Sequence, residues 1–234
     1  MRALRHVLLV LGALLLLCAG APAVAQPTAP AAAAPYPKEP VPCPTTDRVG
    51  AHTPPPAPFQ RYYEDDWRLG PAQLPRSGPI AEMLKGWEGA PPSGSWGRLD
   101  HLSSTEFLGC YWDEDTSGWW FPDPDGWVLI NGTPLHVTVT LQPGQKVDLF
   151  GSGFGHFLAP AGTPFAERAL PPSSLNTLDP AFPFGYHLYE VVQPFTVEAG
   201  PIRPWFAQPG GGLQYLTTPS IPQLVAAGNL RPLN

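Results

Sequence analysis

The sequence contains few charged residues and, beyond its first residues, no long apolar run. Asp, Glu, Lys and Arg make up 14% of the chain, and no segment after Leu17 reaches the roughly 20 apolar residues that a membrane-spanning helix needs. The apolar run Val7–Leu17 is shorter, follows a basic start and precedes the small residues Ala23–Ala25. This order predicts a signal peptide over residues 1–25. We therefore expect cleavage before Gln26, no later membrane contact, and a mature protein that is secreted, extracellular or held at the cell surface.

Basic side chains are scarce as well. The chain has 13 Lys and Arg against 19 Asp and Glu, and residues 1–25 contain two of the arginines and no acid. The mature chain therefore keeps 11 basic against 19 acidic side chains, a net charge of −8. A protein this acidic repels phosphate backbones unless a basic patch offsets its field, and the arginines here are scattered. We expect no nucleic-acid partner.

The sequence has only three cysteines. Cys18 lies in the predicted signal peptide, where it would permit a lipid anchor, but Leu17 stands where such an anchor needs a small residue. The mature chain keeps Cys43 and Cys110, and because an exported protein meets oxidising conditions, a disulfide between them is predicted. Closing a loop of that length would stabilise the fold by about 4 kcal/mol. The alternative is a catalytic thiol, although no motif places a His beside either cysteine.

Composition divides the mature chain into three stretches. Residues 26–58 are rich in Pro and Ala and have almost no apolar periodicity, which predicts an extended linker tied down only near Cys43. Residues 59–144 form a Trp-rich part, and residues 145–234 form the most distinctive part. We expect the last two stretches to share one core and to fold as one globular unit.

Short helices and many strands are predicted for this unit. Helix signals cover Pro79–Trp87 and the segments after two capping boxes, Ser103 with Glu106 and Ser220 with Gln223. Segments rich in β-branched and aromatic residues, separated by Pro and Gly, predict strands at Trp127–Ile130, Leu135–Leu141, Lys146–Phe150, Tyr186–Val192 and Leu213–Leu216. The predicted class is α+β, with a mostly antiparallel β core and a few short peripheral helices.

Two motifs suggest ligands only weakly. The glycines of Gly151–Gly155 resemble a dinucleotide fingerprint, but the third glycine has the wrong spacing and no amphipathic helix follows, so a tight turn is the better interpretation. Asp113 and Asp115 match the first half of a calcium loop, whose second half fails. A polar turn is favoured there over a Ca²⁺ site, which Asp123 could help to complete. Asn131 begins a glycosylation sequon that matters only in a eukaryotic host.

The C-terminal part carries the most specific motifs. Three segments lie in order here: Asp148–Asn176, which includes Phe-Gly-Ser-Gly-Phe-Gly-His-Phe-Leu-Ala-Pro; Tyr186–Val191; and Glu198–Tyr215, which includes Gln-Pro-Gly-Gly-Gly. Together, from about Gln145 to Leu233, they resemble the TNT domain, the family of the tuberculosis necrotizing toxin and of NAD glycohydrolases displayed on fungal surfaces.

This resemblance implies hydrolysis of the bond between nicotinamide and ribose in NAD, with release of ADP-ribose. Nicotinamide leaves a cationic pyridinium as a neutral molecule, so no strong general acid is needed. The site must instead hold the diphosphate, stack the nicotinamide ring and stabilise an oxocarbenium-like ribose while water attacks. NAD is then a substrate, no cofactor is implied, and an immunity partner or a homodimer is a further expectation.

The family motifs assign roles to individual residues. Gln208 would hydrogen-bond a ribose hydroxyl or position water, and the alternative is an amide that caps the glycine turn. Phe150 would stack on nicotinamide, and the alternative is a core residue. Arg168 would hold phosphate, and the alternative is a salt bridge to Glu167 or another acid. His187 would face the substrate site or make a structural hydrogen bond.

Two further residues belong to this predicted site. Phe157 is placed at the substrate with Phe150. Leu149 occupies the position at which the family's Asp-Arg-Phe-Gly segment has an active-site Arg, and a leucine can neither bind diphosphate nor stabilise charge. Three outcomes are open: a weakened enzyme, an enzyme in which Arg203 or Arg168 replaces the missing charge, or a secreted protein that binds NAD-like ligands without turnover. An ADP-ribosyl transferase is disfavoured because its Gln/Glu-X-Glu motif is missing.

Overall fold

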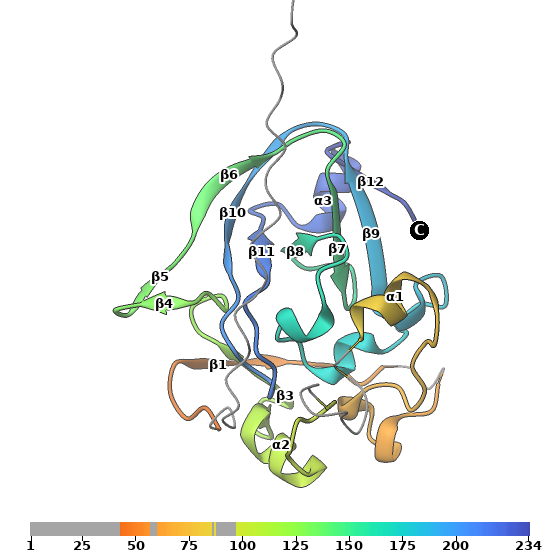
Figure 1. The fold of residues 1–234 in the computed structure, drawn as a ribbon, viewed down its shortest axis with the longest axis vertical. Helices are drawn as coiled ribbons and strands as arrows, with labels where there is room; N and C mark the ends of the chain where they lie inside the picture. Colours follow the sequence, from red (N-terminus) through yellow and green to blue (C-terminus); the bar gives the residue numbers. More distant parts are fainter. Residues whose placement is uncertain (1–42, 57–59, 86, 88–96) are drawn as a thin grey trace, which may run out of the picture. The chain divides into compact units, whose positions relative to one another are not determined.

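The computed structural model describes residues 43–56, 60–85, 87 and 97–234. The predicted signal peptide and residues 26–42 of the predicted linker lie outside this part of the chain. A seven-stranded sheet dominates the described residues (Figure 1). Its order is β12 (Leu230–Pro232), β9 (Tyr186–Val191), β7 (Lys146–Phe150), β8 (Phe157–Pro160), β11 (Leu213–Leu216), β10 (Phe195–Pro201) and β6 (Val137–Leu141).

Every neighbouring pair of strands in this sheet is antiparallel. The remaining strands form a three-stranded sheet of β1 (Arg48–His52), β3 (Gly118–Pro122) and β2 (Trp112–Asp113), and a hairpin of β4 (Leu129–Ile130) and β5 (Thr133–Pro134). The described α-helices are short: α1 (Gly78–Met83), α2 (Ser104–Tyr111) and α3 (Ile221–Ala226). The predicted α+β class with a mostly antiparallel core is confirmed.

Local sequence signals explain the helix starts. Ser103 and Glu106 form the predicted capping box of α2, and Ser220 and Gln223 form that of α3. These side chains satisfy backbone N–H groups that have no partner inside the first helical turn.

Single turns of 3₁₀ helix supply other connections, among them η1 (Tyr63–Asp65), η2 (Trp67–Leu69), η3 (Phe165–Glu167), η4 (Pro172–Leu175) and η5 (Pro183–Gly185). Within the described residues, no helix has the length and apolarity needed to cross a membrane.

Several strands were not predicted. Strand β1 lies in the stretch that was expected to be linker, and it pairs along its length with β3. The sequence also gave no clear signal for β8, β10 and β12, which contain prolines at their ends. Each proline is the last residue of its strand, and tertiary pairing overrides the weak local preference. The predicted helix at Pro79–Trp87 is shorter than expected and ends at Met83.

Alternation along β7 separates two cores. Val147 and Leu149 belong to a cluster that includes Ile221 and Leu224 of α3, whereas Phe150 belongs to a cluster that includes Met83 of α1. Successive side chains of a strand point to opposite faces. The two faces of the large sheet therefore carry different hydrophobic cores, and each has its own cavity.

A third core joins the Trp-rich part to the C-terminal part. It contains Phe107 and Tyr111 of α2, Trp119 of β3, and Trp205 with Phe206 from the turn before β11. Cys43 and Cys110 form the predicted disulfide, which fastens the start of the described chain to α2. Figure 1 shows α2 beside β3, at the end of the large sheet away from α3.

Candidate active site

A small pocket gathers four of the predicted site residues. Leu149, Phe150, Phe157 and Arg168 all line it, and its volume is about 70 Å³. Strands β7, β8 and β11 supply one wall, and the segment after η3 supplies the opposite one. The remaining lining residues are Asp148, Leu158, Ala159, Leu170, Ile202 and Gln214.

A buried ion pair fixes Arg168 in this pocket. Its Nη2 lies 2.7 Å from Oδ1 of Asp148, and the two side chains are 3% and 0% exposed. The other carboxylate oxygen accepts hydrogen bonds from the Tyr186 hydroxyl at 3.1 Å and from the backbone N–H of Gly162 at 2.9 Å. Burial raises the pKa of Asp148, and the Arg168 guanidinium opposes that shift. Burial and the neighbouring carboxylate also raise the pKa of Tyr186, which keeps its hydroxyl protonated as a donor.

The remaining contacts of Arg168 leave one nitrogen free. Nε donates to the Thr163 carbonyl at 2.9 Å, and the guanidinium carbon lies 5.1 Å from the centre of the Phe150 ring. Within the described residues Nη1 has no hydrogen-bond partner. The salt bridge is therefore to Asp148 and not to Glu167, and it leaves Nη1 available as a donor.

The two phenylalanines of the pocket differ in burial. Phe150 is buried and makes edge contacts with Phe165 and Tyr186, at centroid distances of 5.3 and 5.1 Å. Phe157 is 44% exposed, so its ring stands at the open side of the pocket. Leu149 lines the pocket but also belongs to the buried cluster that contains α3. The residue at the family's Arg position is thus part of a hydrophobic core in this chain.

Gln208 does not line the pocket and is fully buried. Its Nε2 donates to the carbonyl of the pocket residue Leu170 at 2.5 Å. Its Oε1 is buried and has no hydrogen-bond partner within the described residues. Buried polar atoms are nearly always paired, and an unpaired one in a native fold often marks a site that awaits a ligand or water. The side chain therefore offers a fixed, unused acceptor next to the pocket.

A strained turn sets the position of Gln208. Trp205 and Gln208 exchange backbone hydrogen bonds of 3.1 and 2.8 Å, and the two residues between them, Phe206 and Ala207, have φ of 50° and 54°. Non-glycine residues rarely adopt this left-handed conformation, which costs roughly 1–2 kcal/mol per residue. The Ala207 N–H donates to the Tyr111 hydroxyl oxygen at 3.0 Å, and the Phe206 ring packs 5.2 Å from the Tyr111 ring. Helix α2 thus stabilises the turn that carries Gln208.

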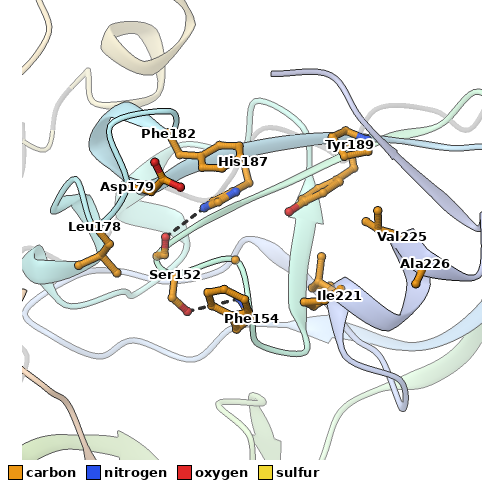
Figure 2. A pocket seen from close by; sticks show the side chains of 15 residues that line it. Ser152, Phe154, Leu178, Asp179, Phe182, His187, Tyr189, Ile221, Val225 and Ala226 are labelled. Atoms are coloured by element: carbon orange, nitrogen blue, oxygen red, sulfur yellow. Dashed lines mark hydrogen bonds between the residues drawn. The ribbon is translucent and has the colours of Figure 1, made fainter.

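His187 is not brought together with the other predicted residues. It lines a separate cavity of about 450 Å³ with Ser152, Phe154 and Asp179 (Figure 2). Its Nε2 donates to the Gly151 carbonyl at 3.3 Å, and its ring stacks on Phe182 at 4.1 Å. Burial lowers the pKa of His187. The structural hydrogen bond that the sequence left open as an alternative is therefore present.

Gly151–Gly155 forms a turn between β7 and β8, as expected, and a Cβ at Gly153 would lie 2.8 Å from the His187 ring.

The possible metal ligands are also committed to turns. Asp113 accepts hydrogen bonds from the Asp115 N–H at 3.0 Å and from the Thr116 hydroxyl at 2.7 Å. Asp123 uses its backbone carbonyl to accept from Arg203 at 2.9 Å. In the part of the chain that the structure describes, no three His, Cys, Asp or Glu side chains are grouped so that they could hold a metal ion. The polar turn stays the favoured interpretation of Asp113 and Asp115, with a Ca²⁺ site as the alternative.

Three residues around the site were not predicted from the sequence. Asp148 and Tyr186 stand in the quoted family motifs, but only the register of β7 with β9 places them around Arg168. Tyr111 lies far from Gln208 in the sequence and has no local signal. The Asp-x-Phe-Gly motif can indicate Asp148, whereas only the packing of α2 reveals Tyr111.

Comparisons with known proteins match the C-terminal part of the chain and a longer stretch of it. The family model described as tuberculosis necrotizing toxin matches residues 140–233. The conidial surface nicotinamide adenine dinucleotide glycohydrolase of Aspergillus fumigatus is 40% identical over 177 residues, which cover 74% of this chain and 71% of that protein. The sequence relationship therefore extends beyond the residues that the family model matches.

The comparison with solved structures gives matches with TM-scores below 0.5. Tuberculosis necrotizing toxin in complex with its immunity factor has a TM-score of 0.48 and 18% identity, and the match covers 80% of this chain and all 100% of that one. Rhs1-CT in complex with its cognate immunity protein has a TM-score of 0.31 and 17% identity, covering 47% of this chain and 85% of that one.

Proposed function

The chain belongs to the tuberculosis necrotizing toxin family, and on that premise we propose that it is an NAD⁺ glycohydrolase. It cleaves the bond between nicotinamide and ribose and releases nicotinamide and ADP-ribose. The observation that carries this proposal is the 40% identity with a glycohydrolase of that specificity over more than two thirds of both chains. The gathering of Phe150, Phe157 and Arg168 around one pocket, with Gln208 next to it, agrees with the proposal.

The pocket suits one end of the dinucleotide. Its volume of about 70 Å³ is far below the roughly 300–1,000 Å³ of sites that enclose whole ligands, so the rest of NAD would lie across the open side. The Phe150 ring offers a surface for the nicotinamide ring, and Phe157 stands at the open side. The free Nη1 of Arg168 supplies a charge-assisted hydrogen bond to a phosphate or a ribose oxygen.

Gln208 is the group that we assign to the reacting ribose. Its unpaired Oε1 accepts a hydrogen bond from a ribose hydroxyl or from the attacking water, and the contact of Nε2 with Leu170 fixes its orientation. Gln208 is fully buried and lies outside the pocket lining, so NAD binding has to open a path to Oε1 before this contact forms. Nicotinamide departs as a neutral molecule, so no residue has to protonate it.

The protein acts outside the cell under this proposal. Its relative is named as a conidial surface enzyme, and a disulfide between Cys43 and Cys110 persists in oxidising compartments. NAD is consumed as a substrate, and no redox cofactor takes part. A toxin role, an immunity partner and a homodimer remain predictions.

The test is nicotinamide release by the purified, secreted protein, measured beside Gln208→Met and Thr217→Val. Gln208→Met keeps the side-chain length and removes the amide, and we expect kcat to fall by about 10²–10³-fold, the usual loss of one preorganised group. Thr217→Val removes a buried hydroxyl that donates to the His156 carbonyl outside the pocket, and it should retain activity. A wild-type protein that releases no nicotinamide at high enzyme concentration would refute the proposal.

A Leu149→Arg variant examines the departure from the family motif. Because Leu149 is packed in a hydrophobic cluster, we expect an arginine there to lower stability without raising activity. An inactive wild type that becomes active in this variant would instead identify a binding protein with a decayed catalytic site.

A further inference from the structure

A second cavity lies on the opposite face of β9 from the active-site pocket. His187 and Tyr189 of β9 line it, whereas Tyr186 on the same strand belongs to the cluster around Phe150. Its volume of about 450 Å³ falls within the range of roughly 300–1,000 Å³ typical of small-molecule sites. None of the residues assigned above to NAD hydrolysis lines this cavity, which we call the α3 cavity.

The walls of the α3 cavity are mainly apolar (Figure 2). One side is helix α3, and the other is formed by the turns that follow β7 and precede β9. Apolar and aromatic side chains from these segments are Phe154, Leu178, Phe182, Ile221, Val225 and Ala226. Such a surface favours the apolar body of a ligand because its contact removes hydrocarbon from water.

A tyrosine hydroxyl without a partner opens into this cavity. Tyr189 is 6% exposed, and its hydroxyl points inward among the lining residues (Figure 2). Within the described residues that hydroxyl has no hydrogen-bond partner. The hydroxyl of Tyr189 is thus a polar anchor that the protein itself does not use.

The charge of the lining selects the ligand. Asp179 is the only acidic side chain among the lining residues, and no Lys or Arg is present there. One oxygen of Asp179 accepts the Ala181 N–H at 2.9 Å, and the other accepts no hydrogen bond from the described residues. His187 adds no positive charge at neutral pH because burial lowers its pKa. A diphosphate such as NAD or ADP-ribose would therefore meet no cation in this cavity and one carboxylate.

We propose that the α3 cavity is a second ligand site, which binds a small, mainly apolar molecule that carries an ammonium group. The apolar body lies against α3 and Phe182. A polar group of the ligand pairs with the Tyr189 hydroxyl, and the ammonium group lies near the second carboxylate oxygen of Asp179. This site is separate from the hydrolytic pocket and does not depend on the proposed glycohydrolase activity.

Two matched probes test the proposal with the purified secreted protein. Phenethylamine and phenylacetate have similar size and opposite charge, and ligand-observed NMR measures the binding of each. We expect phenethylamine to bind about fivefold more tightly, a modest preference because Asp179 is exposed and solvent weakens its attraction. Asp179→Asn, which keeps the acceptor for the Ala181 N–H, should abolish that preference.

Two further variants locate the binding. Ala226→Phe places a ring in the cavity from an exposed position on α3, and it should remove phenethylamine binding while nicotinamide release stays at the wild-type rate. Phenethylamine has no second polar group, so the Tyr189 contact is tested with tyramine, which adds a phenol hydroxyl to it. Tyr189→Phe should weaken tyramine binding about two- to tenfold, the contribution of one hydrogen bond, and should leave phenethylamine binding and stability unchanged.

Some results would overturn the proposal. These are absence of binding by both probes, equal binding of the two, or binding that persists in Ala226→Phe. Displacement of phenethylamine by NAD in an active enzyme would assign the cavity to the substrate site and would equally refute a separate ligand site. A protein that binds phenethylamine as expected but releases no nicotinamide would refute only the glycohydrolase.

Discussion

Tyr111→Phe isolates the contact by which the Trp-rich part supports the catalytic turn. The change removes the oxygen that accepts the Ala207 N–H at 3.0 Å. It keeps the ring, which packs 5.0 Å from Phe107 and 5.2 Å from Phe206. Ala207 is 2% exposed, so water cannot readily replace the lost acceptor. An unpaired buried N–H costs about 1–3 kcal/mol, and we expect a loss of that size in the free energy of unfolding.

Activity should fall in the same variant. Phe206 and Ala207 hold left-handed conformations that are intrinsically unfavourable, and the bond to Tyr111 helps to offset that cost. If the full 1–3 kcal/mol is lost from the population of the productive turn, kcat falls by about 5- to 160-fold, since each 1.36 kcal/mol is tenfold. Nicotinamide release at saturating NAD measures kcat, and urea unfolding measures stability.

Two controls make the result specific. Tyr215→Phe removes the hydroxyl of another buried tyrosine, one with no hydrogen-bond partner among the described residues, and should change neither quantity. Ala207→Gly relieves the backbone strain at φ 54°, so it should restore part of the activity when combined with Tyr111→Phe. The reasoning fails if Tyr111→Phe matches Tyr215→Phe in both kcat and stability, or if the glycine has no effect.

Three more predictions concern stability. Asp148→Asn leaves the buried Arg168 charge without its counterion, and we expect it to lower the free energy of unfolding in urea by about 3–5 kcal/mol. Glu190→Gln breaks the exposed pair with Arg231 and should cost less than about 1 kcal/mol. Equal effects of the two variants would contradict the structural role of the buried pair. Cys110→Ser opens a disulfide with a sequence separation of 67 residues and should lower the free energy of unfolding by about 4 kcal/mol. Reduction of the wild type should have the same effect. A loss below about 1 kcal/mol would show that the loop is already constrained without the disulfide. Burial lowers the native pKa of His187 below about 6.5, so the unfolded state binds more protons and stability should fall as the pH drops below that value. His187→Gln should reduce this fall in melting temperature, and identical pH profiles for the wild type and His187→Gln would disprove the assignment.

Much of the fold could be predicted from local patterns. The capping boxes at Ser103 and Ser220 begin α2 and α3, and the β-branched segment Lys146–Phe150 forms β7 with the predicted bounds. Strands with weak local signals could not be found in this way. Strand β1 is formed by Arg48–His52, a segment with little β preference, because it pairs with Gly118–Pro122. Such pairing depends on residues far away in the sequence, and no local window contains them.

The candidate site could likewise be predicted only in part. The motifs indicated Phe150, Arg168 and Gln208, but not that the partner of Arg168 is Asp148, or that His187 faces a different cavity. Alternation along β7 and β9 decided both facts, because the antiparallel register sets which side chains share a face.

The sequence by itself identified the family, because its motifs are contiguous, and it predicted the reaction class and the export of the chain from those motifs and from composition. Only the tertiary structure decided how the site is held. It packs Tyr111 against the turn that carries Gln208, buries the charge of Arg168 against Asp148, and places Leu149 in a core. These contacts join residues that lie far apart in the chain or on opposite faces of one strand. Their energies arise from burial and hydrogen bonding, which exist only once the sheet and its two cores have formed.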